Sequence, residues 1–140
     1  MDFKKCSKIN KNKVVSASEK GKIFRIENRS LRRISKVEVD GCLITDDKIR
    51  CDYLFEIDKP ITEVIYLELK GKNINKAYRQ LKATIGYLKT RHSKVVKKFA
   101  YIVASRVPKP RGNVRELKVK MKRDYNTQLF VRIRKAEVTV

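Results

Sequence analysis

The fold is decided by the stretch VIYLELKG, residues 64–71. It is rich in β-branched and aromatic residues and ends at a glycine, which is typical of a largely buried central strand. Two charged residues, Glu68 and Lys70, interrupt this apolar run. Because side chains alternate between the two faces of a strand, residues two apart share a face and lie roughly 7 Å apart. We therefore expect Glu68 and Lys70 to face one site.

Patterned segments before this stretch predict further strands. Apolar and polar residues alternate from Lys22 to Ile44, with Asp40-Gly41 in the middle, which favours strands and most simply a hairpin. Residues 49–57 form a second strand region, which carries Asp52. The chain therefore reaches the central strand through a series of strands.

Segments after this stretch alternate between helix and strand. Asn73 is a good N-cap for a helix that runs to about Arg91, because apolar residues recur there at three- and four-residue steps. Residues 99–104 predict another buried strand, and the prolines of 107–112 require a loop. Residues 114–123 suit a helix or a strand, and a short helix is preferred. Residues 129–140 predict a last strand, interrupted near Lys135. This order predicts an α/β fold.

The size and charge of the chain limit its function. Its 140 residues show no repeat or composition break, so we expect one domain over 1–140, with residues 1–13 as a flexible basic arm or a first strand. The net charge is +21, from 36 Lys and Arg against 15 Asp and Glu, which implies a polyanionic partner. Apolar runs are short and basic residues recur throughout, so nucleic acid is favoured over a membrane.

Some basic residues are candidate phosphate contacts, although any one of them is more often a solvated surface charge. They are Lys72, Lys94, Lys97, Lys98, Lys118, Lys120, Lys122 and Arg123.

The cysteines and the histidine predict no further chemistry. Cys6, Cys42 and Cys51 are far apart and lack a CxxC spacing, so neither a disulfide framework nor a zinc site is expected, and a reducing cytoplasm fits. His92 follows the predicted helix among basic residues, so a cation at a helix C-terminus is the preferred interpretation, not a metal ligand.

Asp52 adds a second carboxylate to the site if its strand pairs beside the central one. Asp52 and Glu68 would then hold a hard divalent cation, Mg²⁺ or Mn²⁺, with the backbone carbonyl of Leu69 between them. Such a metal lowers the pKa of a bound water, and the Lys70 ammonium can orient that water and offset charge on a phosphate. This combination predicts phosphodiester hydrolysis.

The spacing of these residues resembles a known family signature. Asp52, fifteen intervening residues and then Glu68-Leu69-Lys70 resemble the PD-(D/E)XK motif of restriction-endonuclease-like nucleases. The resemblance implies a mixed central sheet flanked by helices with an N-terminal β-hairpin, in which a hairpin strand brings the Asp and the next strand brings the E-x-K. It also implies that Asp52 and Glu68 bind the catalytic metal, that Lys70 is the catalytic lysine, and it suggests a homodimer.

Other positions match the family less closely. In some branches a Gln on the helix after the lysine lies near the active site, and Gln80 is the matching candidate, although Thr84 stands where one such branch has Tyr. Cys51 replaces the Pro of the motif. The helix that often donates a further Glu is not evident, which leaves Glu19 and Glu27 as weak candidates and Asp40 as the alternative carboxylate, itself also explained by an Asp-Gly turn. For Gln80, a hydrogen bond to a neighbouring loop is an equal alternative.

The leading hypothesis is a magnesium-dependent endonuclease, with DNA favoured over RNA. The alternative is a non-catalytic basic nucleic-acid-binding protein, for which the charge alone suffices. A third hypothesis is a nuclease-fold subunit without activity.

Overall fold

The computed structural model describes residues 1–71, 73–106 and 112–140; of Lys70, Gly71 and Gly112 only the backbone is described. In this part of the chain a large mixed sheet has the strand order β1-β4-β5-β6-β7-β8. Its strands are β1 (Ser7–Asn10), β4 (Ile34–Glu38), β5 (Tyr53–Ile57), β6 (Glu63–Gly71), β7 (Lys97–Ala104) and β8 (Thr127–Ile133). Antiparallel pairing joins β1, β4, β5 and β6, whereas β6, β7 and β8 are parallel.

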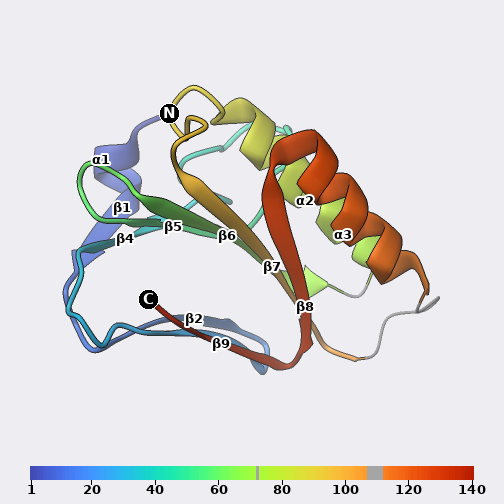
Figure 1. Cartoon of the computed structure of the whole chain (residues 1–140), viewed down its shortest axis with the longest axis horizontal. Coiled ribbons are helices and arrows are strands. Elements are labelled where there is room, and N and C mark those ends of the chain that lie inside the picture. The colour runs from blue at the N-terminus through green and yellow to red at the C-terminus, as the bar shows by residue number, and fades with distance from the viewer. Residues whose placement is uncertain (72, 107–111) are drawn as a thin grey trace.

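Helices α2 (Ile74–Tyr87) and α3 (Gly112–Tyr125) cross over between the parallel strands and cover one face of this sheet (Figure 1). The Asn73 side chain caps α2 by accepting a 3.1 Å hydrogen bond from the Lys76 N–H, as predicted, but α2 ends at Tyr87, earlier than expected. Apolar residues of both helices pack on the sheet around Tyr66, which is fully buried. Each large apolar side chain buried in this way contributes about 1.5–3 kcal/mol.

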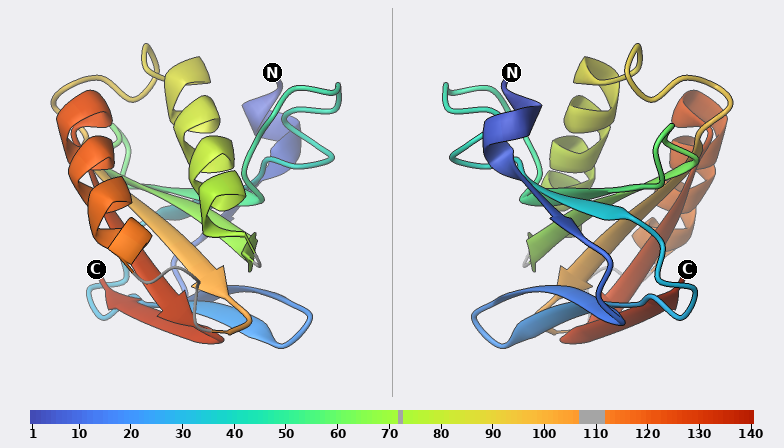
Figure 2. Two further views of the ribbon diagram at one scale, coloured as in Figure 1. Left: turned by 90° about the vertical axis from the view of Figure 1, so that its right-hand side faces the viewer. Right: turned by 90° about the vertical axis from the view of Figure 1, so that its left-hand side faces the viewer.

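A second sheet covers the opposite face. It has the order β2-β3-β9 and consists of β2 (Val14–Glu19), β3 (Lys22–Glu27) and β9 (Lys135–Thr139). Its apolar side chains, including Phe24, pack against Phe55 and Tyr101 of the large sheet, with ring centroids 5.5 and 5.1 Å from that of Phe24. Figure 2 shows the resulting three layers, with the helices and the small sheet on opposite sides of the large one.

The predicted α/β class with a mixed central sheet is confirmed, but two details differ. The sheet is not flanked by long helices on both faces, because β2, β3 and β9 occupy the second face. The hairpin lies over residues 14–27, earlier than the 22–44 stretch suggested. Its turn is Lys20-Gly21, where both residues have positive φ (47° and 78°), as a two-residue hairpin turn requires.

The segment between β3 and β4 moves the chain from one sheet to the other. The Asn28 side chain fixes it, donating to the Asn12 and Arg32 carbonyls at 3.0 and 2.8 Å and accepting from the Arg32 N–H at 2.9 Å. Asn28 is fully buried. Strands β3 and β4 therefore belong to different sheets and cannot form the expected hairpin with each other.

The C-terminal predictions are confirmed. Residues 114–123 lie within the helix α3, and the last strand breaks at Arg134, whose φ is 61°. The break lets β8 pair in the large sheet and β9 pair parallel to β3 in the small one. Most of the predicted 107–112 loop lies outside the described residues. At the other end of the chain, residues 7–10 form the strand β1, which agrees with one of the two interpretations of the basic segment.

A disulfide contradicts the expectation from cysteine spacing. Cys6, at the end of the short helix α1 (Phe3–Cys6), is bonded to Cys42 in the loop after β4, and their Cα atoms are 5.7 Å apart. The bond forms because β1 pairs with β4, which brings together segments that are distant in sequence. Disulfides are rare in reducing compartments, so the cysteines do not favour a cytoplasmic location. No described helix has the length and apolar character needed to cross a membrane.

Candidate active site

Asp52 and Glu68 meet where β5 and β6 lie side by side. The antiparallel register pairs Tyr53 with Leu67, which places Asp52, the residue before β5, beside Glu68. The Asp52 N–H donates to the Leu67 carbonyl at 3.1 Å, and its carboxylate Oδ2 accepts from the Leu69 N–H at 2.8 Å. Only 5% of Asp52 and 1% of Glu68 are exposed. The predicted pairing of the two strands is thus confirmed, and it brings two buried carboxylates together.

The backbone around Asp52 is held from two sides. The Asp52 carbonyl accepts hydrogen bonds from the N–H groups of Val39 and Asp40 at 3.0 and 3.2 Å. On the helix side, the Cys51 N–H donates to the Thr84 hydroxyl at 2.9 Å, and that hydroxyl donates to the Gln80 carbonyl at 3.0 Å. The position of Asp52 therefore depends on the loop after β4 and on α2 as well as on the sheet.

Carboxylates gather in a pocket at this end of the strands. The pocket has a volume of about 240 Å³ and is lined by Ser18, Glu19, Glu38, Asp40, Asp52 and Tyr53. Four of the 15 acidic residues of a chain with a charge of +21 thus line one small pocket. We call these four residues the carboxylate pocket.

The carboxylate pocket draws residues from three regions of the sequence. The hairpin strand β2 supplies Glu19, so the structure brings this weak candidate to Asp52, and it brings Asp40 there as well. Glu27, the other weak candidate, is paired with Arg25 at 2.9 Å and does not line this pocket. Glu38, at the end of β4, was missed. Its position two residues before Asp40 would have indicated a shared strand face.

Arg50 connects Asp40 to α2. Its Nε donates to Asp40 Oδ1 at 3.0 Å, and its backbone carbonyl accepts a 3.3 Å hydrogen bond from the Gln80 amide. Gln80 therefore contacts the main chain two residues before Asp52. A direct catalytic role for Gln80 stays a prediction, whereas the alternative interpretation, a hydrogen bond to a neighbouring loop, is observed.

The remaining predicted site residues are described in part. The backbone of Lys70 belongs to β6, but its side chain lies outside the described residues, as does the whole of Lys72. Between the pairs Glu68–Ile102 and Gly71–Ala104, β6 contains one more residue than β7. Such a bulge bends a strand locally and is common beside active sites. The roles of Lys70 and of the Leu69 carbonyl stay predictions.

No family model, curated protein or solved structure matches this chain. The chemistry of the site must therefore be inferred from its own residues.

The donor atoms suit a hard divalent cation. No three His, Cys, Asp or Glu among the described residues form a ready-made metal group, so protein ligands would be few. A site with few protein ligands suits Mg²⁺, because this ion keeps several waters and needs only one or two carboxylates. The nearby Cys51 does not offer a soft ligand, since burial raises the pKa of its thiol to about 12 and keeps it protonated. The oxygen donors of Asp52 and Glu68 therefore fit Mg²⁺ or Mn²⁺ better than Zn²⁺.

The basic residues predicted to contact phosphate lie elsewhere. A pocket of about 300 Å³ at the start of β7 is lined by several of them, Lys94, Lys97, Lys98 and Lys122. Lys97 pairs with Glu63, five residues from Glu68 along β6, which is roughly 17 Å. Lys118 is exposed on α3, where Lys120 pairs with Glu116 and Arg123 with Asp124. The pocket at β7 is thus separated from the carboxylate pocket by most of a strand.

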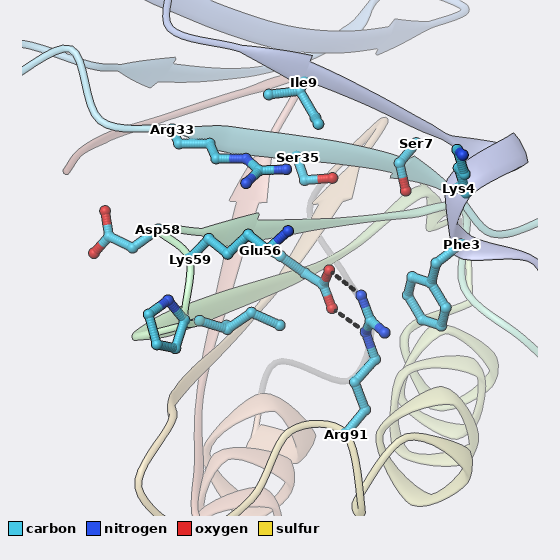
Figure 3. Close-up of a pocket in the computed structure, with 12 residues that line it drawn as sticks. Phe3, Lys4, Ser7, Ile9, Arg33, Ser35, Glu56, Asp58, Lys59 and Arg91 are labelled. Carbon is cyan, nitrogen blue, oxygen red and sulfur yellow. Dashed lines mark hydrogen bonds and ion pairs between the residues drawn. The ribbon is translucent and has the colours of Figure 1, made fainter.

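A larger pocket, of about 570 Å³, lies toward the opposite end of β5 and contains an ion pair between the buried Glu56 and the exposed Arg91 (Figure 3). Arg91 donates two hydrogen bonds to the Glu56 carboxylate, at 2.7 and 2.9 Å. His92 bridges Glu56 and the Tyr66 hydroxyl through its two ring nitrogens, and it is 1% exposed. The predicted helix-capping role of His92 is therefore wrong, because the chain after α2 turns inward and buries it. Since both Glu56 oxygens are engaged, this network stabilises the fold.

Proposed function

We propose that this protein is a metal-dependent nuclease that hydrolyses phosphodiester bonds, with DNA as its substrate and Mg²⁺ or Mn²⁺ as its cofactor. The observation that supports this most is the position of two buried carboxylates, Asp52 directly before β5 and Glu68 on the neighbouring β6, beside a further group of acidic residues. The resemblance to the PD-(D/E)XK motif implies the same pair, on a hairpin strand and the strand that follows it.

The charge distribution favours a catalyst over a simple binding protein. A chain with a charge of +21 attracts nucleic acid without any acidic cluster. Carboxylates gathered beside a phosphate-binding surface repel the phosphates unless a cation lies between them. The carboxylate pocket is therefore a cost to a non-catalytic protein, whereas in a metal-dependent nuclease the bound cation offsets the repulsion.

Each residue has a definite part in the proposed reaction. Asp52 and Glu68 would hold the cation, which when bound polarises the phosphate and lowers the pKa of a water. Lys70 orients the attacking water and offsets the negative charge that develops on the phosphate oxygens. Thr84 is a positioning residue, because its hydroxyl fixes the backbone that carries Asp52.

A cleavage panel tests the proposal. Single-stranded, duplex and branched DNA, and RNA, are incubated with the protein in Mg²⁺, in Mn²⁺ and in chelator. We expect metal-dependent cleavage of DNA that is lost in Glu68→Gln. Glu63→Gln is the matched control, because Glu63 lies on the same strand at its far end, paired with Arg32. Salt-sensitive binding without cleavage of any substrate would instead support the non-catalytic alternative.

A further inference from the structure

A second pocket, rich in cations, lies beside the carboxylate pocket. It has a volume of about 290 Å³, and its lining residues are Asp40, Lys48, Ile49, Arg50, Lys76, Arg79 and Gln80. Four of these seven residues are basic. The loop between β4 and β5 forms one wall, and the first turns of α2 form the other.

The two pockets meet at Asp40, which lines both of them. Arg50 holds Asp40 at this boundary through the 3.0 Å hydrogen bond from its Nε. The guanidinium of Arg50 also donates to the carbonyls of Lys48, at 2.8 Å, and Asp46. These three interactions engage Arg50 in the structure of the loop, so it forms part of the wall.

Lys76 and Arg79 are available for a ligand. Both are exposed, and they lie three residues apart on α2, which places them on neighbouring positions of one helix face. Within the part of the chain that the structure describes, neither side chain forms an ion pair. Lys48 Nζ lies 3.5 Å from the exposed Asp46 carboxylate and 6.0 Å from the centroid of the Tyr87 ring, and exposed contacts of these two kinds contribute little. The pocket therefore presents three cationic side chains that can accept an anion.

We propose that Lys48, Lys76 and Arg79 form a subsite for a backbone phosphate of the nucleic acid, next to the phosphate that is cleaved. This inference rests on the proposed nuclease function and extends it by placing the substrate strand. A strand whose cleaved phosphate lies at Asp52 and Glu68 carries further charges at intervals of about 3.4 Å of helix axis. A neighbouring phosphate then lies beyond Asp40, where these cations offset its charge. The substrate strand runs from the carboxylate pocket toward the start of α2, and not along the lysines at the start of β7.

Binding measured without cleavage tests the subsite. The protein in chelator is titrated with a short DNA duplex over a range of salt concentrations, and Lys76→Ala/Arg79→Ala is compared with Lys118→Ala/Lys122→Ala. Both pairs lie on helices, and each variant loses two positive charges. We expect the slope of log Kd against log salt to fall by about 1 in the first variant, since the subsite binds one phosphate and each phosphate contact contributes about 0.9. A smaller change is expected in the second.

A double-mutant cycle that combines a modified phosphate with the protein variant locates the subsite relative to the cleaved bond. Replacing a phosphate next to the cleaved one by a neutral methylphosphonate should weaken binding of the unmodified protein and have little effect on Lys76→Ala/Arg79→Ala. The subsite would be overturned by equal salt slopes in both double variants. It would also be overturned if the methylphosphonate weakened binding of Lys76→Ala/Arg79→Ala as much as binding of the unmodified protein, and either outcome would leave the nuclease proposal intact. Conversely, absence of DNA cleavage in Mg²⁺ and in Mn²⁺ contradicts the nuclease proposal. In that case the salt dependence of Kd still tests the phosphate contact.

Discussion

The Asp52 carboxylate accepts a 2.8 Å hydrogen bond from the backbone N–H of Leu69, the residue that separates Glu68 from Lys70. This hydrogen bond connects the Asp of the motif directly to the backbone of its E-x-K segment on β6. It also fixes the rotation of the Asp52 carboxylate, so that one oxygen is engaged with β6. Preorganised ligands of this kind lower the entropic cost of binding a cation.

Asp52→Asn should separate the structural role of this residue from its charge. The amide oxygen can still accept from the Leu69 N–H, so the fold should be retained, but the negative charge is lost. In Asp52→Ala the buried N–H loses its acceptor, which costs about 1–3 kcal/mol. We expect Mg²⁺ to raise the melting temperature of the unmodified protein and of neither variant, because only a folded state that binds the ion is stabilised. An equal shift in all three proteins would exclude Asp52 as a ligand.

Thr84→Val should impair the position of Asp52 without replacing a proposed metal ligand. Thr84 is fully buried, and its hydroxyl accepts from the Cys51 N–H. Removing the hydroxyl should lower the free energy of unfolding by about 1–3 kcal/mol and reduce cleavage by shifting Asp52. Thr84→Ser keeps the hydroxyl and should restore both quantities. Urea denaturation and cleavage rates measure the two effects, and loss of activity in Thr84→Ser would argue against the hydrogen bond as the cause.

Glu56 should make the free energy of unfolding depend on pH in the acidic range. Burial acts to raise the pKa of this carboxyl, but hydrogen bonds from Arg91 and His92 outweigh it and lower the pKa from 4.5 to about 2. A carboxyl with a depressed pKa contributes stability above its unfolded-state pKa and loses it as the pH falls through the folded-state value. We therefore expect a loss on the order of 3 kcal/mol between about pH 4.5 and 2. In Glu56→Gln, the free energy of unfolding, measured by denaturation, should be lower than that of the unmodified protein at neutral pH. It should also change less with pH between about pH 4.5 and 2.

The disulfide between Cys6 and Cys42 should be a measurable part of the stability. It joins residues separated by 36 positions, and a cross-link of that span typically stabilises by about 2–4 kcal/mol. A reducing agent should therefore lower the melting temperature of the unmodified protein to that of Cys6→Ser/Cys42→Ser and leave the variant unchanged. Mass spectrometry after thiol alkylation verifies the redox state. Identical melting temperatures in both states would contradict a stabilising bond.

Local patterns predicted much of the fold and the central part of the site. The α2 helix follows from apolar spacing and the Asn73 cap, and β6 follows from its β-branched residues and glycine end. The pairing that joins Asp52 to Glu68 was a condition of the predicted site and is what the resemblance to the PD-(D/E)XK motif implies. Each of these features is encoded within a short window of sequence.

Features that depend on distant segments were missed. The Cys6–Cys42 bond and the arrival of Glu38 beside Glu19 require knowledge of which strands and hairpins meet. The second face of the large sheet was expected to carry a helix, because the resemblance implies flanking helices. Nothing in the alternating pattern of β2 and β3 indicates that they leave the large sheet to cover that face. His92 was misassigned because its partner Glu56 lies on a strand far back in the sequence.

The parallel pairing of β3 with β9 has a consequence for how the chain matures. Ile26 lies opposite Val138, so one layer of the protein is built from segments that are far apart in the sequence. During synthesis the hairpin emerges early, but its sheet cannot be completed until residues 135–139 have left the ribosome. Until then the apolar surface around Phe24 and Phe55 lacks its final cover, and such exposed surface makes a nascent chain prone to aggregation. The net charge of +21 opposes such aggregation, because highly charged chains repel one another.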